Sequence, residues 1–345
     1  MEIGDRPCMN TEFDTLLKNN TWTLVPPTSA TNVIGCKWGF RVKRKVDGSI
    51  ERYKARLVVK GFHQLIGIDY DETYSPVIKP TTVQNVLSLA ISSGWPIQQI
   101  DIQNAFLHGS LSERVYMSHP PGFTHPQHPH HLCKLNKALY GLKQAPRARF
   151  SRLSCKLLAL GFSNSKSDTS LFLYNCKEYT MFVLIYVDDI LITSSSSPAI
   201  HELLAALHNE FAVKDLGKLH FFLGIEVVPS SDGYILSQQR YIVDLLKCTK
   251  MLEAKPAMSP MASSTHLSAY EGDIFSNPTL YRSTIGALQY LCITRPDISY
   301  CVNKLSQFMQ NPTELHWQAT KRLLRYLKQT VQYGLQLHKS NTRAI

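Results

Sequence analysis

Two adjacent aspartates, Asp188 and Asp189, stand between two runs of apolar residues. Residues 181–185 precede them and residues 190–192 follow them, and each run predicts a buried strand. An isolated ionised carboxylate in such a setting costs several kcal/mol, so a divalent cation is the strongest candidate to compensate the charge. The pattern predicts a tight hairpin that aims both acids into a cleft. The alternative is a plain turn between two strands, since aspartate favours turns.

A third acid, Asp101, lies between Ile100 and Ile102 in another apolar stretch that predicts a strand. Hard cations such as Mg²⁺ prefer carboxylates together with substrate phosphates. Three acids from two strands would suit two metal ions about 4 Å apart, the arrangement used for phosphoryl transfer. The alternative for Asp101 alone is an aspartate at a strand edge.

The basic residues are concentrated in two stretches. The chain carries 37 Lys and Arg against 26 Asp and Glu, a net charge of +11. Residues 37–60 hold nine Lys or Arg and two acids, and residues 134–156 hold seven and none. Such stretches suit a phosphate-contacting surface, the alternative being two solvated basic faces.

Composition and cysteine spacing exclude several classes of protein. A hydrophobic content of 44% is too high for a mostly disordered chain, and no apolar run is long enough to cross a bilayer. The eight cysteines include no CxxC pair, so we expect free thiols in a reducing compartment, cytoplasmic or nuclear.

Hydrophobic periodicity predicts a mixture of strands and helices. Asp47-Gly48 is a hairpin signal between two β-rich segments. The predicted strands cover 33–46, 52–62, 97–106, 171–174, 179–193 and 220–228, and the predicted helices cover 81–92, 146–160, 198–211, 238–250, 279–292, 298–309 and 314–329. The early strands alternate with helices, whereas the end of the chain is helical.

The order of the motifs resembles a known family. Asp101 with Ala105-Phe106, then residues 139–146, 186–189 and 222–226, follow the order of reverse transcriptase motifs. The stretches 54–62, 67–77, 104–109 and 294–298 resemble copia-type LTR-retrotransposon reverse transcriptases. The resemblance extends over most of the chain.

The resemblance implies an α+β fold of the right-hand polymerase type. Residues 1–30 would be an N-terminal extension and residues 31–95 the fingers. Residues 96–230 would form the palm, with an antiparallel sheet and a fingers/palm helix at 140–160. Residues 231–345 would be a helical thumb and the start of a connection.

The resemblance also implies a set of site residues. The catalytic and metal-binding acids would be Asp101, Asp188 and Asp189, holding two Mg²⁺ ions or Mn²⁺ in their place. The dNTP-binding residues would be Lys54, Arg56, Phe106, Tyr140, Gly141, Lys143 and Gln144, with Phe106 as a steric gate against a ribose 2′-OH. The primer grip would be Phe222, Leu223 and Gly224.

Simpler roles stay open for most of these residues. Phe106 could be an ordinary core aromatic, and Lys54 and Arg56 could contact only template. Residues 140–146 could be a loop-to-helix cap, and residues 222–224 could serve strand packing. One departure concerns Arg149, which stands where the family usually has an aromatic residue.

The implied function is RNA-directed DNA polymerisation, with an RNA or DNA template-primer and dNTPs as partners and no membrane. The ribonuclease H and integrase parts of a Pol polyprotein are expected to be missing from this chain. Two rival interpretations remain: a truncated, non-catalytic remnant that only binds nucleic acid, and an RNA-templated RNA polymerase, which shares the same arrangement of acids.

Overall fold

The computed structural model describes residues 5–27, 32–44, 47, 49–262 and 266–338. The fold is a mixture of helices and several β-sheets, as the sequence predicts. The chain divides into two compact units. Unit 1 comprises Met1–Ile78, Gln99–Ile192 and Ser197–Leu216, and unit 2 comprises Lys79–Gln98, Thr193–Ser196 and Gly217–Ile345.

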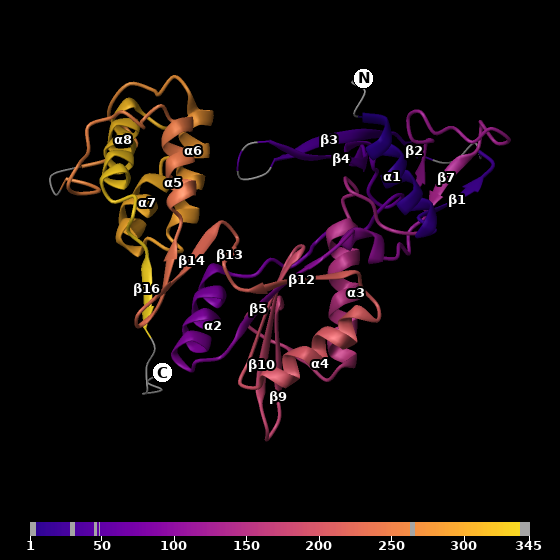
Figure 1. The fold of residues 1–345 in the computed structure, drawn as a ribbon. Helices are drawn as coiled ribbons and strands as arrows, with labels where there is room; N and C mark the ends of the chain where they lie inside the picture. Colours follow the sequence, from indigo (N-terminus) through magenta and orange to yellow (C-terminus); the bar gives the residue numbers. More distant parts are fainter. Residues whose placement is uncertain (1–4, 28–31, 45–46, 48, 263–265, 339–345) are drawn as a thin grey trace. The chain divides into compact units, whose positions relative to one another are not determined.

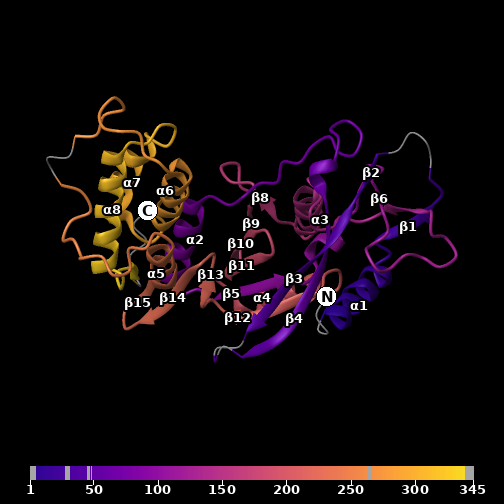
Figure 2. The ribbon, with the colours of Figure 1, turned by 90° about the horizontal axis from the view of Figure 1, so that it is seen from above.

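The basic hairpin of unit 1 is confirmed. Strands β3 (Cys36–Arg44) and β4 (Ile50–Val59) pair antiparallel, with Arg41 opposite Lys54 and Gly39 opposite Arg56. Gly48 of the predicted Asp47-Gly48 turn lies outside the described residues. Helix α1 (Asp5–Lys18) packs along β4, so the N-terminal segment contacts the basic hairpin (Figure 2).

A small sheet of unit 1 brings the N-terminal strands together with the middle of the chain. Its order is β1-β7-β6-β2, with bounds β1 (Trp22–Val25), β7 (Leu132–Leu135), β6 (Tyr116–Met117) and β2 (Val33–Ile34). Its buried side chains form one cluster with Leu57 and Val59 of β4 and with Phe106. The basic hairpin is therefore anchored by apolar packing at its inner end.

The main sheet of unit 1 has the order β12-β5-β11-β10-β9-β8. Its strands are β12 (Val213–Lys218), β5 (Ile97–Ile102), β11 (Asp189–Ser194), β10 (Thr180–Tyr186), β9 (Leu171–Asn175) and β8 (Ser163–Asn164). Helices α3 (Ala145–Ala159) and α4 (Ser197–His208) contribute Leu153, Leu157, Leu203 and Leu207 to the core of this sheet (Figure 1). The helical spacing of these leucines explains why both helices lie on the sheet.

The strand predicted at 97–106 is too long. Strand β5 ends at Ile102, because Asn104 has a positive φ of 51° and a short 3₁₀ helix, η2 (Ala105–His108), follows. A left-handed residue interrupts the extended backbone that a strand requires. Asp101 therefore lies one residue before the end of its strand.

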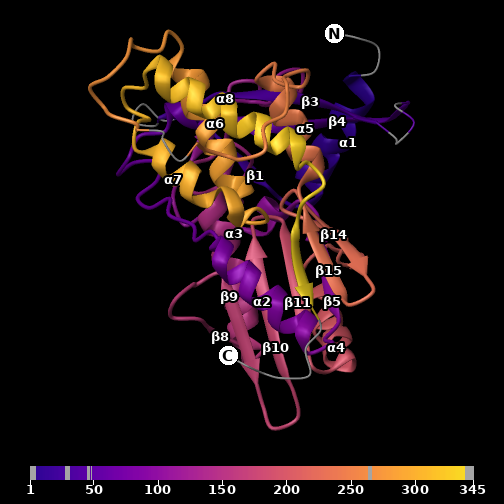
Figure 3. The same cartoon turned by 90° about the vertical axis from the view of Figure 1, so that its left-hand side faces the viewer.

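Unit 2 combines a four-stranded sheet with a group of helices (Figure 3). The sheet order is β13-β14-β15-β16, with bounds β13 (Phe221–Phe222), β14 (Ile225–Ser230), β15 (Gly233–Ser237) and β16 (Leu335–His338). The helices are α2 (Pro80–Ser92), α5 (Gln239–Cys248), α6 (Pro278–Leu291), η3 (Pro296–Ile298), α7 (Ser299–Ser306) and α8 (Glu314–Gln329). The strand predicted at 220–228 is split, since Leu223 and Gly224 both have positive φ.

Helix ends in unit 2 follow local sequence signals. Asn277 accepts a hydrogen bond from the Leu280 amide, 3.0 Å away, and Pro278 opens α6. At the start of α8 the Thr313 amide donates to His316 Nδ1 over 2.9 Å, a capping box with histidine in place of glutamate. Among the described residues, no helix combines the length and apolarity that crossing a membrane requires.

Candidate active site

The paired aspartates stand at the turn between β10 and β11. Tyr186 ends β10 and Asp189 begins β11, so Val187 and Asp188 make the tip of a tight hairpin. Val187 has a φ of 45°, which is unusual for a β-branched residue. The hairpin that the flanking apolar runs predict is confirmed, but only Asp188 of its two acids lines the neighbouring cavity. Its strained tip is the kind of backbone that clusters at functional sites.

Asp101 is brought to this turn by strand pairing. Strand β5 neighbours β11 in the sheet, and the Ile102 amide donates to the Asp188 carbonyl over 3.4 Å. Burial raises the pKa of both Asp188 and Asp189, and the charge of Asp101 raises each further. The three carboxylates therefore lie near enough to repel one another.

A cavity of about 470 Å³ opens beside these acids, and all of its lining belongs to unit 1. Asp101 and Asp188 line it together with Lys54 and Arg56 of β4 and with Tyr140. Residues more than 130 positions apart thus place carboxylates and cations around one space. Such a set can bind a group that carries both phosphates and a metal ion.

An aromatic and cationic stack borders the cavity. The Arg56 guanidinium carbon lies 4.3 Å from the centre of the Tyr140 ring, a cation–π contact. The Phe106 ring meets Tyr140 edge to face, with ring centres 4.7 Å apart. Phe106 is buried, at 9% exposure, and is not among the cavity-lining residues.

Helix α1 adds an acid that the sequence reasoning missed. Glu12 lines the cavity, where burial raises its pKa and the charges of Lys54 and Arg56 oppose that rise. The pKa of Lys54 is lowered, first by burial and then by Arg56. The first 20 residues have only a weak hydrophobic pattern, so no sequence signal pointed to Glu12. Lys214 lines the same cavity.

Residues 141–144 lie against the loop that follows β4. Gly141 has a φ of 93°, and a Cβ there would come within 2.1 Å of the Val59 carbonyl oxygen, so only glycine fits. Lys143 donates to Tyr70 Oη over 3.0 Å, and buried Gln144 donates to the Asp69 carbonyl over 2.8 Å. These residues hold the loop and do not line the cavity.

Arg149 reaches the candidate catalytic acids. Although it belongs to the second basic stretch, its side chain is only 5% exposed, and its Nε lies 3.5 Å from Asp188 Oδ1. Burial lowers the pKa of Arg149 despite the carboxylate beside it. Arg149 Nε, Arg149 Nη2 and Asp188 Oδ1 are buried atoms that have no hydrogen bond to any described residue, which is costly in a low-dielectric setting.

The predicted primer-grip residues belong to unit 2. Phe222 is buried at 1% exposure, and Leu223 and Gly224 form a turn with φ of 51° and 71°. A Cβ at Gly224 would lie 3.2 Å from Tyr290 Oη. The turn is therefore tightly packed against α6.

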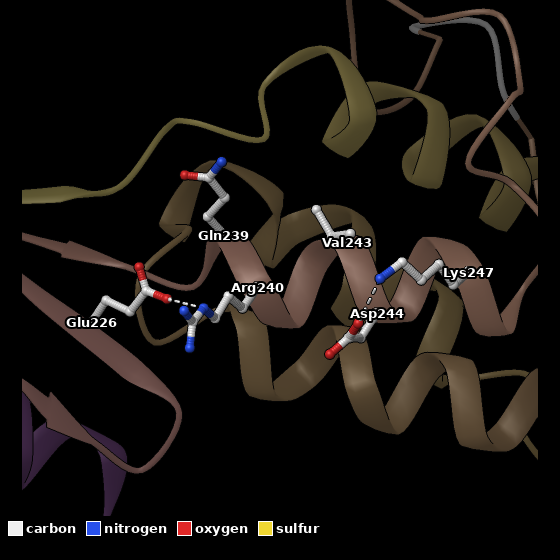
Figure 4. Close-up of a pocket in the computed structure, with 6 residues that line it drawn as sticks. All are labelled: Glu226, Gln239, Arg240, Val243, Asp244 and Lys247. Atoms are coloured by element: carbon white, nitrogen blue, oxygen red, sulfur yellow. Dashed lines mark hydrogen bonds and ion pairs between the residues drawn. The ribbon is translucent and has the colours of Figure 1, made fainter. Parts of the chain in front are cut away.

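A second hollow, also of about 470 Å³, lies on unit 2 (Figure 4). Its charges are paired: Arg240 lies 3.5 Å from Glu226 and Lys247 lies 3.3 Å from Asp244. Compensated surface charges of this kind do not attract a metal ion or a phosphate strongly. The cavity in unit 1 is therefore the better candidate for chemistry.

The acids of unit 1 have the chemistry that a hard divalent cation requires. Carboxylate oxygens are its preferred ligands, and the buried Asp188 Oδ1 accepts no hydrogen bond. Within the part of the chain that the structure describes, no three His, Cys, Asp or Glu side chains are grouped closely enough to hold a metal ion. The carboxylates are the right kind of ligand for a divalent cation, but their side chains are not yet close enough together to bind one.

The arrangement of motifs and acids is matched by one family model, described as reverse transcriptase (RNA-dependent DNA polymerase), over residues 19–263. The chain belongs to the reverse transcriptase family. The match includes the acids, the basic hairpin and the 222–224 turn, so the resemblance of the motifs to this family is confirmed.

Curated relatives place this reverse transcriptase among copia-type elements. It is 52% identical to a retrovirus-related Pol polyprotein from transposon RE1 of Arabidopsis thaliana, over 99% of the chain and 23% of the relative. It is 40% identical to the corresponding polyprotein from transposon TNT 1-94 of Nicotiana tabacum, over 93% of the chain and 25% of the relative. The chain thus spans about a quarter of the length of these relatives.

Proposed function

We propose that the chain catalyses RNA-directed DNA polymerisation, in which the 3′-hydroxyl of a primer on an RNA or DNA template attacks a dNTP, gains one dNMP unit and releases pyrophosphate. The observation that carries the proposal is the cavity of unit 1, in which Asp101 and Asp188 face the cations Lys54 and Arg56. Positioning and charge stabilisation supply most of the catalysis in phosphoryl transfer, and this lining offers both.

The roles follow from the chemistry of each side chain. Asp101, Asp188 and Asp189 would hold two Mg²⁺ ions, which supply Lewis-acid stabilisation of the phosphate charge. Lys54 and Arg56 would bind the triphosphate, and Arg56 is kept in place by its stack on Tyr140. A guanidinium suits this role because its forked donors match phosphate oxygens.

The right-hand organisation is part of the proposal. Residues 31–95 would act as fingers, 96–230 as palm and 231–345 as thumb with the start of a connection. Phe222, Leu223 and Gly224 would seat the primer end. Lys143 and Gln144 would act on the nucleotide through the 64–70 loop that they hold. The remaining portions of a Pol polyprotein would be partners of this chain.

Primer extension on an RNA template tests the proposal. The wild-type chain, at saturating Mg²⁺, should extend a labelled primer, and Asp101→Asn and Asp189→Asn should abolish the signal. Arg240→Met, on the surface of unit 2, is the matched control. Extension that is equal in wild type and both aspartate variants would contradict polymerase function.

Phe106 distinguishes the DNA polymerase from an RNA-templated RNA polymerase. Its ring packs edge to face on Tyr140, which lines the cavity, so it lies next to the space that the sugar of a bound nucleotide would occupy. Phe106→Val should reduce the preference for dNTP over rNTP in the same assay. An unchanged preference would contradict the gate.

The contact between Arg149 and Asp188 favours a second candidate function, a remnant that binds nucleic acid without turnover. Such a protein would bind a template-primer with strong salt dependence and would not extend it at any Mg²⁺ concentration. Binding without extension would support this second candidate over the first.

A further inference from the structure

We propose that the Arg149 guanidinium acts as a built-in cation at the candidate catalytic centre, where it binds the Asp188 carboxylate and competes with a divalent metal ion for it. This inference rests on the proposed function, since it takes Asp188 as a metal ligand. It assigns to Arg149 the role of a positioning residue that controls metal affinity.

The contact is electrostatic and poorly bonded. The distance of 3.5 Å between Arg149 Nε and Asp188 Oδ1 is longer than the 2.7–3.2 Å of an ordinary N–H···O hydrogen bond. Neither atom has a hydrogen bond elsewhere. The guanidinium therefore neutralises the charge of the Asp188 carboxylate but gives it no hydrogen bond. A metal ion bound to Asp188 would supply the ligand contact that the carboxylate lacks.

Arg149 has little freedom to withdraw. It lies near the start of α3, and a Cβ placed on Gly109 would lie 3.0 Å from the Arg149 amide nitrogen. The backbone of α3 is thus held close to the segment after η2. With the side chain 95% buried, a metal ion at Asp188 requires the guanidinium to change its side-chain conformation within a packed core.

The ionised groups that act on the Arg149 guanidinium are carboxylates and not other cations. They are those of Asp101, Asp188 and Asp189. A guanidinium and a divalent ion would share these same carboxylates, and their like charges repel strongly at short range in a partly buried site. Occupation by one cation therefore weakens the other.

Metal binding by the nucleic-acid-free chain tests the proposal without measuring activity. Free Mn²⁺ is followed by electron paramagnetic resonance as the protein is added. Arg149→Met should bind Mn²⁺ at least about tenfold more tightly than wild type, from the loss of one charge a few ångströms from the ion. Arg149→Gln should do the same, whereas Arg149→Lys should stay close to wild type because it keeps the charge.

Two controls make the result specific. Arg152→Met removes a neighbouring arginine of α3 that is 53% exposed and pairs loosely with Glu210, and it should leave Mn²⁺ affinity unchanged. Asp101→Asn in the Arg149→Met background should remove the gained affinity. Thermal unfolding of each variant shows whether it is folded.

A second measurement follows metal binding in the wild-type chain itself. The arginine Nε–H resonances are recorded by ¹⁵N nuclear magnetic resonance, with Arg149→Lys used only for assignment. Saturating Mg²⁺ should move the Arg149 resonance as the metal displaces it from Asp188, and should leave that of Arg240 in place.

The outcomes separate this inference from the proposed function. If wild type and Arg149→Met bind Mn²⁺ equally and Asp101→Asn abolishes both, the inference on Arg149 is overturned while the metal site stands. If Asp101→Asn changes binding in neither background, both the inference and the proposed site are overturned. A Mg²⁺-insensitive Arg149 resonance in a chain that binds the metal through Asp101 also overturns the inference.

Discussion

Among the residues that the structure describes, two buried arginines pair with aspartates, one in each unit, and their surroundings differ. Arg295 in unit 2 is 1% exposed and forms two short bonds to Asp297, of 2.9 and 2.7 Å, and two to Thr330, of 2.9 and 2.7 Å. Arg149 in unit 1 is 5% exposed and meets Asp188 only at 3.5 Å, leaving Nε and Nη2 without hydrogen bonds.

The pKa directions show which influence dominates in each pair. At Asp297 burial is the largest single influence and raises the pKa, but the hydrogen bonds and charge of Arg295 together with the hydrogen bond from Tyr326 outweigh it, and the net pKa is lowered. At Asp188 burial outweighs Arg149, and the net pKa is raised. We therefore expect the Arg295–Asp297 pair to stabilise the fold and the Arg149–Asp188 pair to cost stability, as charges at the proposed metal site would.

The largest expected effect comes from breaking the satisfied pair. Arg295→Met leaves Asp297 and the Thr330 carbonyl without their buried donors, so the free energy of unfolding should fall by about 3–5 kcal/mol. Urea unfolding of the whole chain, followed by circular dichroism, measures the loss. A change below about 1 kcal/mol would show that the bonding of Arg295 is not what stabilises unit 2.

Replacing both Arg149 and Asp188, the pair without hydrogen bonds, should change the free energy of unfolding in the opposite direction. Arg149→Met with Asp188→Asn removes two poorly bonded charges, which should raise the free energy of unfolding by about 1–2 kcal/mol. The matched double variant, Arg295→Met with Asp297→Asn, should be destabilising because Thr330 loses its partner. If both double variants shift stability in the same direction, the contrast between the pairs is wrong.

The stabilisation by the Arg295–Asp297 pair should depend on pH. Because the folded pKa of Asp297 is below its ordinary value of 3.8, its stabilisation is complete above that value and is lost as the pH falls through the folded pKa. The stability difference between wild type and Asp297→Asn should therefore shrink in acid. We expect about 1 kcal/mol or less, since the carboxylate is partly exposed and screened.

Taking the stability difference between wild type and Asp297→Asn cancels the contributions of all other titrating groups. His316 is buried and has a lowered pKa, so it destabilises wild type and variant alike as the pH falls through 6.5. A difference that stays constant down to the acid transition would show that Asp297 does not titrate with folding.

The smallest effect is expected at an exposed pair. Arg240 is 85% exposed and lies 3.5 Å from Glu226 (Figure 4), and Arg240→Met should change the free energy of unfolding by less than about 0.5 kcal/mol. Added salt should remove even that change. A loss as large as that of Arg295→Met would mean that burial with full hydrogen bonding does not decide the strength of these pairs.

Local sequence patterns predicted most elements of the structure. The apolar runs around Asp188 and Asp189 give β10 and β11, and the amphipathic spacing at 314–329 gives α8 at the same bounds. Predictions failed where single residues take positive φ: Asn104 ends β5 early, and Leu223 with Gly224 splits a predicted strand. Such residues break an element without altering its hydrophobic pattern.

By itself the sequence predicted the candidate acids and determined the basic hairpin and the family, because carboxylates in apolar strands and long ordered motifs are visible along the chain. Only the tertiary structure decided that Glu12 enters the cavity beside Lys54 and that Arg149 turns inward to Asp188. Both contacts join residues far apart in sequence. Charge along a chain does not reveal which face of a helix will be buried, since packing against the rest of the fold makes that choice.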